Sequence, residues 1–171
     1  MRLRLQRLSA VNAAQLEALA EVLHSCVHGG ASVSFMLPFT VDDARAFWRG
    51  VAEGVARGER ALVVAEVDGR LRGTVQLVLA QPPNQPHRAD LAKMLVHREA
   101  RRLGLGALLL AEAESVARAE GKTLLVLDTA SPEAERLYTR GGWLPAGVVP
   151  GYALLPQGGL CDTRFFYKTL A

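Results

Sequence analysis

Hydrophobic and polar positions along the chain follow two periods, one of two residues and one of three to four. Period-two runs and short continuous apolar runs predict strands at 2–7, 61–67, 70–80, 89–96, 123–128, 143–149 and 163–170. Asp68-Gly69 joins the second and third of these runs, and such a pair between β-rich segments predicts a hairpin. Residues 150–159 lie between the last two strands and are predicted to form a long loop.

Helical periodicity predicts four helices, and three of them begin at a typical capping residue. Asn12, Thr40 and Ser131 can each accept a hydrogen bond from a first-turn N–H group. Gln15 stands three residues after Asn12, where its side chain can complete a capping box. The fourth helix opens at two glycines and has the most regular pattern, with apolar Leu105, Leu108, Leu109, Ala113 and Val116 at helical spacing and polar Glu112, Glu114 and Arg118 between them.

The predicted elements run in the order strand, helix, helix, hairpin, strand, helix, strand, helix, strand, strand. This order predicts a mixed α/β chain in which strands and helices share one core. The chain has 171 residues, enough for a core of useful size. No repeat, low-complexity tract or linker interrupts it, so we expect a single domain over residues 1–171.

Composition narrows the classes of function. The net charge is only +3 and the 20 Lys and Arg residues are dispersed, which argues against a dedicated nucleic-acid binder. No apolar run approaches the about 18 residues that a membrane span needs. The first seven residues alternate charge with leucine and lack the apolar core of a signal peptide. We therefore expect a cytoplasmic protein that binds neither nucleic acid nor membrane.

The cysteines and histidines give little support for a metal or a disulfide framework. Cys26 and Cys161 are too few and too isolated for either. His24 and His28 could share one helix face, but no further ligands are evident nearby. No metal site is predicted.

The strand at 89–96 leads into Arg101-x-x-Gly104-x-Gly106 at the start of the most regular helix. Free N–H groups at a helix start attract anions, and two missing side chains would let a diphosphate approach closely. A P-loop is excluded because Gly-Lys-Ser/Thr is absent, and a dinucleotide fingerprint would need a small residue where Leu109 stands. The motif therefore predicts a diphosphate site of another kind.

Arg101-x-x-Gly104-x-Gly106 matches the Gln/Arg-x-x-Gly-x-Gly/Ala signature of the GNAT acetyltransferases, which the chain resembles along its whole length. The resemblance continues in the helix that ends near Tyr138 and in the Gly142-Trp143 pair after it. Segments 87–96, 125–129, 150–154 and 165–170 resemble more narrowly the branch that includes the tabtoxin resistance protein. The implied fold is a mixed, mostly antiparallel sheet, splayed at two parallel middle strands and flanked by helices.

The resemblance implies acetyl-CoA as co-substrate and no metal. Its pantetheine arm would lie along the backbone of Met94, Leu95 and Val96. Its pyrophosphate would lie at Arg101, Arg102, Leu103, Gly104, Leu105, Gly106 and Ala107. The helix that opens at Ser131 lies toward the same end, so Ser131 and Glu133 are included among the expected cofactor contacts.

Three residues are candidates for the chemistry of acetyl transfer. Tyr138 matches the family's general acid, although without the resemblance its place on an apolar helix side would suggest a core residue. Asp90 and Asp128 are candidate bases or amine ligands. Asp90 begins its strand and Asp128 ends its own, so a fully parallel register would separate them by roughly 15 to 20 Å, which argues against a paired-carboxylate site. Both also have structural alternatives, such as an ion pair of Asp90 with Arg88 or Lys93.

The implied reaction is direct attack of a primary amine on the acetyl thioester. The acceptor side would include Phe35, Met36 and Tyr152, and the narrower resemblance suggests a small amino-acid-like, toxin-like or antibiotic-like amine, hence a role in toxin resistance. Two alternatives stay open: a peptide or protein N-acetyltransferase with an open acceptor groove, and a regulatory acyl-CoA-binding module without turnover. The enzyme is expected to be a monomer or a homodimer.

Overall fold

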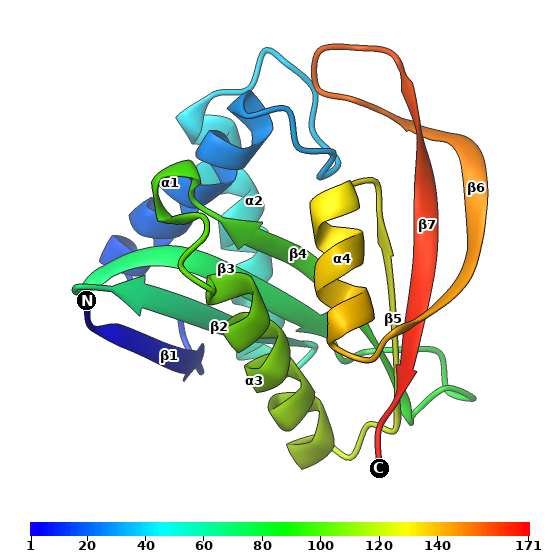
Figure 1. Ribbon diagram of the computed structural model, residues 1–171. Coiled ribbons are helices and arrows are strands. Elements are labelled where there is room, and N and C mark those ends of the chain that lie inside the picture. Colours follow the sequence, from blue (N-terminus) through cyan, green and yellow to red (C-terminus); the bar gives the residue numbers. More distant parts are fainter.

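A computed structural model describes all 171 residues and shows one twisted sheet between two layers of helices (Figure 1). The sheet has seven strands in the order β1-β2-β3-β4-β5-β7-β6, and only β4 and β5 run parallel. The elements are β1 (Leu3–Leu8), α1 (Ala13–His28), α2 (Val41–Ala56), β2 (Arg60–Val67), β3 (Arg70–Val78), β4 (Arg88–Val96), a short 3₁₀ turn (Arg98–Ala100), α3 (Leu105–Ala119), β5 (Leu124–Thr129), α4 (Pro132–Arg140), β6 (Leu144–Leu154) and β7 (Leu160–Thr169). The predicted mixed fold class is confirmed.

The helix starts that were predicted from capping residues are confirmed. Asn12 accepts a hydrogen bond from the Gln15 N–H at 2.8 Å, and the Gln15 side chain accepts one from the Asn12 N–H at 3.0 Å. Thr40 and Asp43 form the same reciprocal pair before α2. Ser131 caps α4 through the Ala134 N–H at 3.2 Å. Each cap satisfies donors that the first helical turn leaves unpaired.

The two parallel strands separate after a short contact. β4 and β5 are paired only at Arg88–Leu124, Ala89–Leu125 and Asp90–Val126. Beyond this point β4 remains paired with β3 as far as Val96, whereas β5 remains paired with β7 as far as Thr129. The sheet is therefore continuous at one end and open between β4 and β5 at the other, which agrees with the predicted splay.

A bulge in β4 changes which face of the sheet its side chains occupy. Lys93 and Met94 together lie opposite the single residue Val75 of β3, and Lys93 has a left-handed backbone with a φ of 52°. Leu91 packs in the core under α3 and α4, whereas Leu95 packs in the core under α1 and α2. A regular strand would place two residues four apart on the same face. The extra residue thus explains why Leu91 and Leu95, four apart in the sequence, lie in opposite cores.

The buried face of α3 differs from the predicted stripe. Leu108 is 38% exposed, whereas Glu114, predicted to be a polar surface residue, is only 6% exposed. Glu114 forms an ion pair with Lys168 of β7, whose ammonium also donates to the Gly141 carbonyl at 2.7 Å. The buried carboxylate is tolerated because this cation neutralises it.

The prediction of a long loop at 150–159 is wrong. β6 continues to Leu154, and only a short turn separates it from β7. A wide irregularity between Val149 and Ala153 accommodates Pro150 and Gly151, and the Gly151 N–H donates to Asp162 at 2.9 Å. Proline breaks a central strand but is tolerated here because β6 is the edge of the sheet.

Candidate functional site

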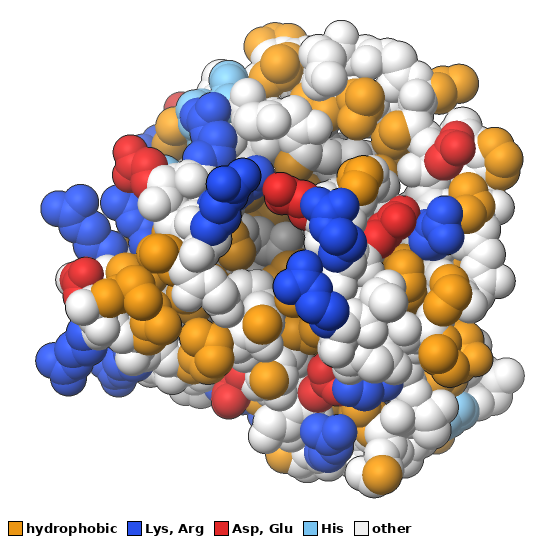
Figure 2. Space-filling view, in the orientation of Figure 1, with side chains coloured by type: hydrophobic (Ala, Val, Ile, Leu, Met, Phe, Trp, Pro, Cys, Tyr) orange, Lys and Arg blue, Asp and Glu red, His pale blue; other side chains and the backbone are white.

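The start of α3 exposes a row of unpaired backbone donors. Gly104 occupies the N-cap position in a left-handed conformation and offers no side chain to cap the helix. The N–H groups of Leu103, Gly104, Leu105, Gly106 and Ala107 have no acceptor within the chain. Figure 2 shows a hollow between the start of α3 and α4, with Lys and Arg side chains along its rim. Free donors and positive charge together make this an anion site.

The two glycines of the motif have different structural roles. A Cβ at Gly104 would meet no atom within 4 Å, but the φ of 80° there strongly favours glycine. A Cβ at Gly106 would lie 3.1 Å from the Leu137 side chain of α4. Gly104 therefore keeps the anion site open, whereas Gly106 allows α3 and α4 to pack closely.

The arginines of the motif lie on the surface, and Arg101 reaches back toward α1. Its charge lowers the pKa of the buried Cys26 thiol, although burial has the larger effect and raises that pKa. The Cys26 Sγ also contacts the Val96 carbonyl oxygen at 3.4 Å. Arg102 is exposed and has a left-handed backbone with a φ of 64°. Arg101 thus adds its charge to the end of β4 as well as to the loop before α3.

The segment from Met94 to Val96 lies along the open edge of β4. Since β5 is no longer paired with β4 after Asp90, the β4 backbone groups that face β5 have no partner strand from there onward. Met94 and Val96 are half-buried, and Leu95 is buried. This is an accessible strand edge on which an extended ligand could form backbone hydrogen bonds.

Tyr138 is a buried ring with an accessible hydroxyl. The ring packs against Trp143 and Phe166, with centroids 5.8 and 6.0 Å away. The hydroxyl has no hydrogen-bond partner within the chain, and it is not completely shielded from solvent. Burial raises the pKa of Tyr138, and the negative charge of Asp128 raises it further. Tyr138 is therefore a protonated donor at neutral pH.

Asp128 lies closer to the level of Asp90 than the sequence suggested. Asp90 is opposite Val126, so Asp128 is only two residues further along, or about 7 Å along the strand axis. The predicted separation of a whole strand length was wrong, because Asp90 is the third residue of β4 and Asp128 is the fifth residue of the short strand β5, whose pairing starts level with Arg88. The exposed Asp128 carboxylate accepts a hydrogen bond from the Thr163 hydroxyl at 2.8 Å.

Asp90 is already engaged within the chain. Its carboxylate forms an ion pair with Arg88 and accepts a hydrogen bond from the Gln81 side chain at 3.2 Å. Arg88 is further held by Gln85 at 2.7 Å and by Gln81 at 2.6 Å. This network favours the structural alternative for Asp90.

The predicted acceptor residues lie on two segments at the open end of the sheet. Phe35 packs against Phe39 and Phe47, with ring centroids 4.8 and 5.3 Å apart. Met36 is 42% exposed. Tyr152 of β6 is also exposed and packs edge-on against Phe165, which is opposite Asp128 in the sheet. Phe35 and Tyr152 thus approach the open end from different sides.

The segment between α1 and α2 is joined to the turn between β6 and β7. The Leu37 N–H donates to the Pro156 carbonyl at 2.9 Å, and the Cys161 thiol lies 3.7 Å from the Ser32 hydroxyl. These contacts form an arch across the open end of the sheet, visible at the top of Figure 1.

Lys93 was not predicted as a site residue, yet it lies on the acceptor side. Its ammonium donates to the Ser34 hydroxyl at 3.0 Å and lies 5.9 Å from the centroid of the Phe47 ring. Burial lowers the pKa of Lys93, while the Asp128 carboxylate raises it. The only feature of the sequence that could have indicated a role for Lys93 is its place as a single lysine within an otherwise apolar stretch of strand.

Ser131 and Glu133 lie at the start of α4. The Ser131 hydroxyl is used by the helix cap, and its N–H donates to the Thr129 hydroxyl at 3.2 Å. Glu133 is exposed in the first turn. No hydrogen bond or ion pair joins these two residues to the anion site at α3.

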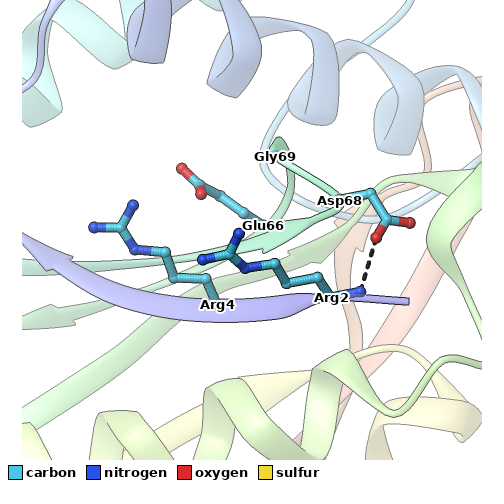
Figure 3. Close-up of a pocket in the computed structure, with 5 residues that line it drawn as sticks. All are labelled: Arg2, Arg4, Glu66, Asp68 and Gly69. Carbon is cyan, nitrogen blue, oxygen red and sulfur yellow. Dashed lines mark hydrogen bonds between the residues drawn. The ribbon is translucent and has the colours of Figure 1, made fainter.

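Other hollows lack the chemistry of this site. A pocket of about 460 Å³ lies at β1 and the β2–β3 turn and has no hydrophobic residue in its lining of Arg2, Arg4, Glu66, Asp68 and Gly69 (Figure 3). The Asp68 carboxylate accepts a hydrogen bond from the Arg2 N–H there at 2.7 Å. No group of three or more His, Cys, Asp or Glu side chains is arranged to hold a metal ion. None of the helices is long and apolar enough to span a membrane.

Comparisons with known proteins show the family of the chain. A family model described as the acetyltransferase (GNAT) family matches residues 30–143. An uncharacterized N-acetyltransferase from the hisH-hisA intergenic region of Azospirillum brasilense is 30% identical over 125 residues, covering 72% of this chain and 73% of that protein.

Two solved structures illustrate the shared fold. An N-acetyltransferase from Staphylococcus aureus Mu50 has a TM-score of 0.82 at 21% identity, with all of both chains covered. A phosphinothricin acetyltransferase from Sinorhizobium meliloti in complex with AcCoA has a TM-score of 0.80 at 20% identity, covering 100% of this chain and 90% of that one.

Proposed function

The chain belongs to the GNAT acetyltransferase family and is an acetyl-CoA-dependent N-acetyltransferase, and from this premise we propose that its acceptor is the primary amine of a small molecule, which attacks directly. Acetyl-CoA supplies a reactive acetyl thioester when it is bound. The chain's own residues must then hold the cofactor, orient the amine and move two protons.

The residues around α3 fit the cofactor. The free N–H groups from Leu103 to Ala107 and the open space at Gly104 suit a diphosphate. The unpaired edge of β4 from Met94 to Val96 suits the amide groups of the pantetheine arm. Arg101 and Arg102 add favourable charge. Ser131 and Glu133 remain proposed contacts with weaker support, because Ser131 already caps α4.

Tyr138 and Asp128 are the proposed catalytic residues. Tyr138 holds a proton on its hydroxyl at neutral pH and can donate it toward a departing thiolate. The Asp128 carboxylate is exposed at the open end and can attract an ammonium group or accept a proton from it. We assign Asp90 a structural role in its network with Arg88 and Gln81 instead of direct contact with the amine.

The arch across the open end is the observation that carries the small-molecule proposal. The hydrogen bond between Leu37 and Pro156 ties the Phe35–Met36 segment to the β6–β7 turn. A peptide acceptor would need a groove open at both ends, and this link obstructs one of them. Phe35, Met36 and Tyr152 are the proposed acceptor contacts.

Release of free thiol from acetyl-CoA tests this proposal. The purified chain is incubated with acetyl-CoA and a panel of small primary amines, free amino acids and short peptides. Turnover of small amines is expected. Turnover of peptides alone would favour the peptide N-acetyltransferase, and tight CoA binding without any release would favour the non-catalytic module.

The narrower parts of the proposal follow the same resemblance. We propose that the chain belongs to the branch that includes the tabtoxin resistance protein, acts in the cytoplasm on a toxin-like or antibiotic-like amine, and is a monomer or homodimer. Its partners would be small molecules, without nucleic acid or membrane. The dispersed basic residues support the absence of a nucleic-acid partner.

A further inference from the structure

We propose that the acceptor carries a carboxylate beside its amine, as an α-amino acid does, and that Lys93 binds this carboxylate while Asp128 faces the amine. This inference rests on the proposed N-acetyltransferase function and specifies the class of acceptor. It assigns Lys93 as the residue that determines specificity.

The ammonium of Lys93 is incompletely satisfied within the chain. Of the three lysines, Lys122 donates to two backbone carbonyls, at 3.0 and 2.9 Å, and Lys168 pairs with Glu114. Lys93 has only the Ser34 hydroxyl, and no carboxylate lies within ion-pair distance of it. An ammonium has three donors, so a half-buried Lys93 keeps two of them for a ligand.

Asp128 is held near Lys93 without forming an ion pair with it. Leu125 and Leu127 of β5 pack in the core of α3 and α4, so Asp128 lies on the opposite face of the sheet, where Lys93 also extends. Burial lowers the pKa of Lys93, and the Asp128 charge partly offsets this effect. The only side-chain partner of Asp128 is the Thr163 hydroxyl. A cation on β4 and an anion on β5 therefore face the gap between the two strands. Such a separated pair complements a zwitterion, with its carboxylate toward Lys93 and its amine toward Asp128.

The backbone aims Lys93 into this position. The left-handed conformation of Lys93 is unfavourable for a residue with a Cβ, and the bulge opposite Val75 holds it. The side chain then extends toward Ser34 and over the Phe47 ring, on the acceptor side of the sheet.

A comparison of free amino acids with their primary amides tests the inference. The probes are glycine, L-alanine, L-methionine, L-phenylalanine and L-glutamate, each as the free acid and as the α-amide. The wild-type chain should have a kcat/KM for at least one acid roughly 10- to 100-fold above that for its amide, the effect of one charged hydrogen-bonded contact. Lys93→Met should remove this preference, mainly by raising KM for the acid.

Control variants separate specificity from folding. Lys93→Met should still bind CoA with unchanged affinity, and Lys93→Arg should restore part of the preference for the acid. Lys122→Met is the matched control, since Lys122 donates to carbonyls outside the site. It should keep the wild-type ratio of acid to amide.

The alternative outcomes are distinct. Equal rates with acids and amides, or an equal loss on both in Lys93→Met, would overturn the role of Lys93 and leave the N-acetyltransferase proposal standing. Turnover of simple amines without any turnover of amino acids would do the same. No turnover of any amine would overturn both proposals together.

Discussion

Replacing Gly104 with glutamate should abolish tight binding of coenzyme A while leaving the fold in place. Gly104 is exposed at the start of α3, and a Cβ there would meet no other atom within 4 Å. The new carboxylate would lie among the free N–H groups from Leu103 to Ala107. It would occupy the same donors that the diphosphate needs and would repel it.

The magnitude follows from charge and distance. At about 5 to 6 Å, two like unit charges repel by about 0.8 kcal/mol at the dielectric constant of water and about 3 kcal/mol at a value of 20. A diphosphate presents two charges, so the affinity should fall by roughly 10- to 10⁴-fold. The positive φ of Gly104 adds a loss of folding free energy of about 1 to 2 kcal/mol.

The matched control is Gly104→Gln. Glutamine has the same size and the same unfavourable backbone conformation as glutamate but no charge, so the two variants should unfold at similar temperatures. Isothermal titration calorimetry with CoA should show an affinity at least about 10-fold lower for Gly104→Glu than for Gly104→Gln at low salt. High salt should narrow this difference, because it screens exposed charges.

A cofactor without the diphosphate tests whether the loss of affinity in Gly104→Glu arises at the anion site. S-acetyl-pantetheine has the reactive thioester but no diphosphate, so the ratio of its kcat/KM between the two Gly104 variants should be close to one. Unchanged CoA affinity in a folded Gly104→Glu variant would refute the anion site. An equal loss with S-acetyl-pantetheine would show that the substitution disturbs the site by another route.

Three further predictions concern the catalytic side chains. Tyr138→Phe should lower kcat by roughly 10²-fold or more, and a wild-type rate would make Tyr138 a core residue only. The pKa of Tyr138 is raised in the folded chain, so the unfolded chain loses this proton first as the pH rises. The free energy of unfolding of the wild type should therefore fall relative to that of Tyr138→Phe above about pH 10, and not below it. Thermal melts across that pH test this prediction. Asp128→Asn should lower kcat/KM by roughly 10²-fold. Asp90→Asn should mainly lower the free energy of unfolding, by about 1 kcal/mol or less, because the ion pair of Asp90 with Arg88 is partly exposed. A larger loss of kcat/KM in Asp90→Asn than in Asp128→Asn would show that Asp90 takes part in the reaction.

Local signals in the sequence predicted most of the elements. The capping box at Asn12, the helix start at Thr40, the Asp68-Gly69 turn and the cap at Ser131 each act within a few residues, and all are present. The glycine motif was also local, because a helix start without a side-chain cap exposes donors in any fold. The family resemblance then supplied the splayed sheet, which local patterns did not contain.

Features that depend on neighbouring strands were missed. The spacing of Leu91, Met94 and Leu95 fits neither a strand nor a helix until the bulge at Lys93 is known. The separation of Asp90 and Asp128 depends on where β4 and β5 start pairing, which neither strand alone specifies. Glu114 was assigned to the surface because its cation, Lys168, is more than fifty residues away in the chain.

The same bulge explains how one strand can contribute to both sides of the proposed reaction. Lys93 extends toward Ser34 and Phe47 on the face of α1 and α2, while Met94 packs toward the core of α3 and α4. Adjacent residues of β4 thus contribute to the acceptor side and to the cofactor side. A regular strand would also alternate faces, but it could not place Leu91 and Leu95 in opposite cores.

The position of the bulge therefore has a functional consequence. Deleting one residue at Lys93 or Met94 would restore regular pairing opposite Val75. Leu91 and Leu95 would then be three positions apart and would stay on opposite faces, because the side-chain period of a strand is two. Leu95 would keep its place in the α1–α2 core and its pairing with Thr74 of β3. We conclude that both cores could be built without the extra residue, and that what the bulge adds is the orientation of Lys93 toward the acceptor side.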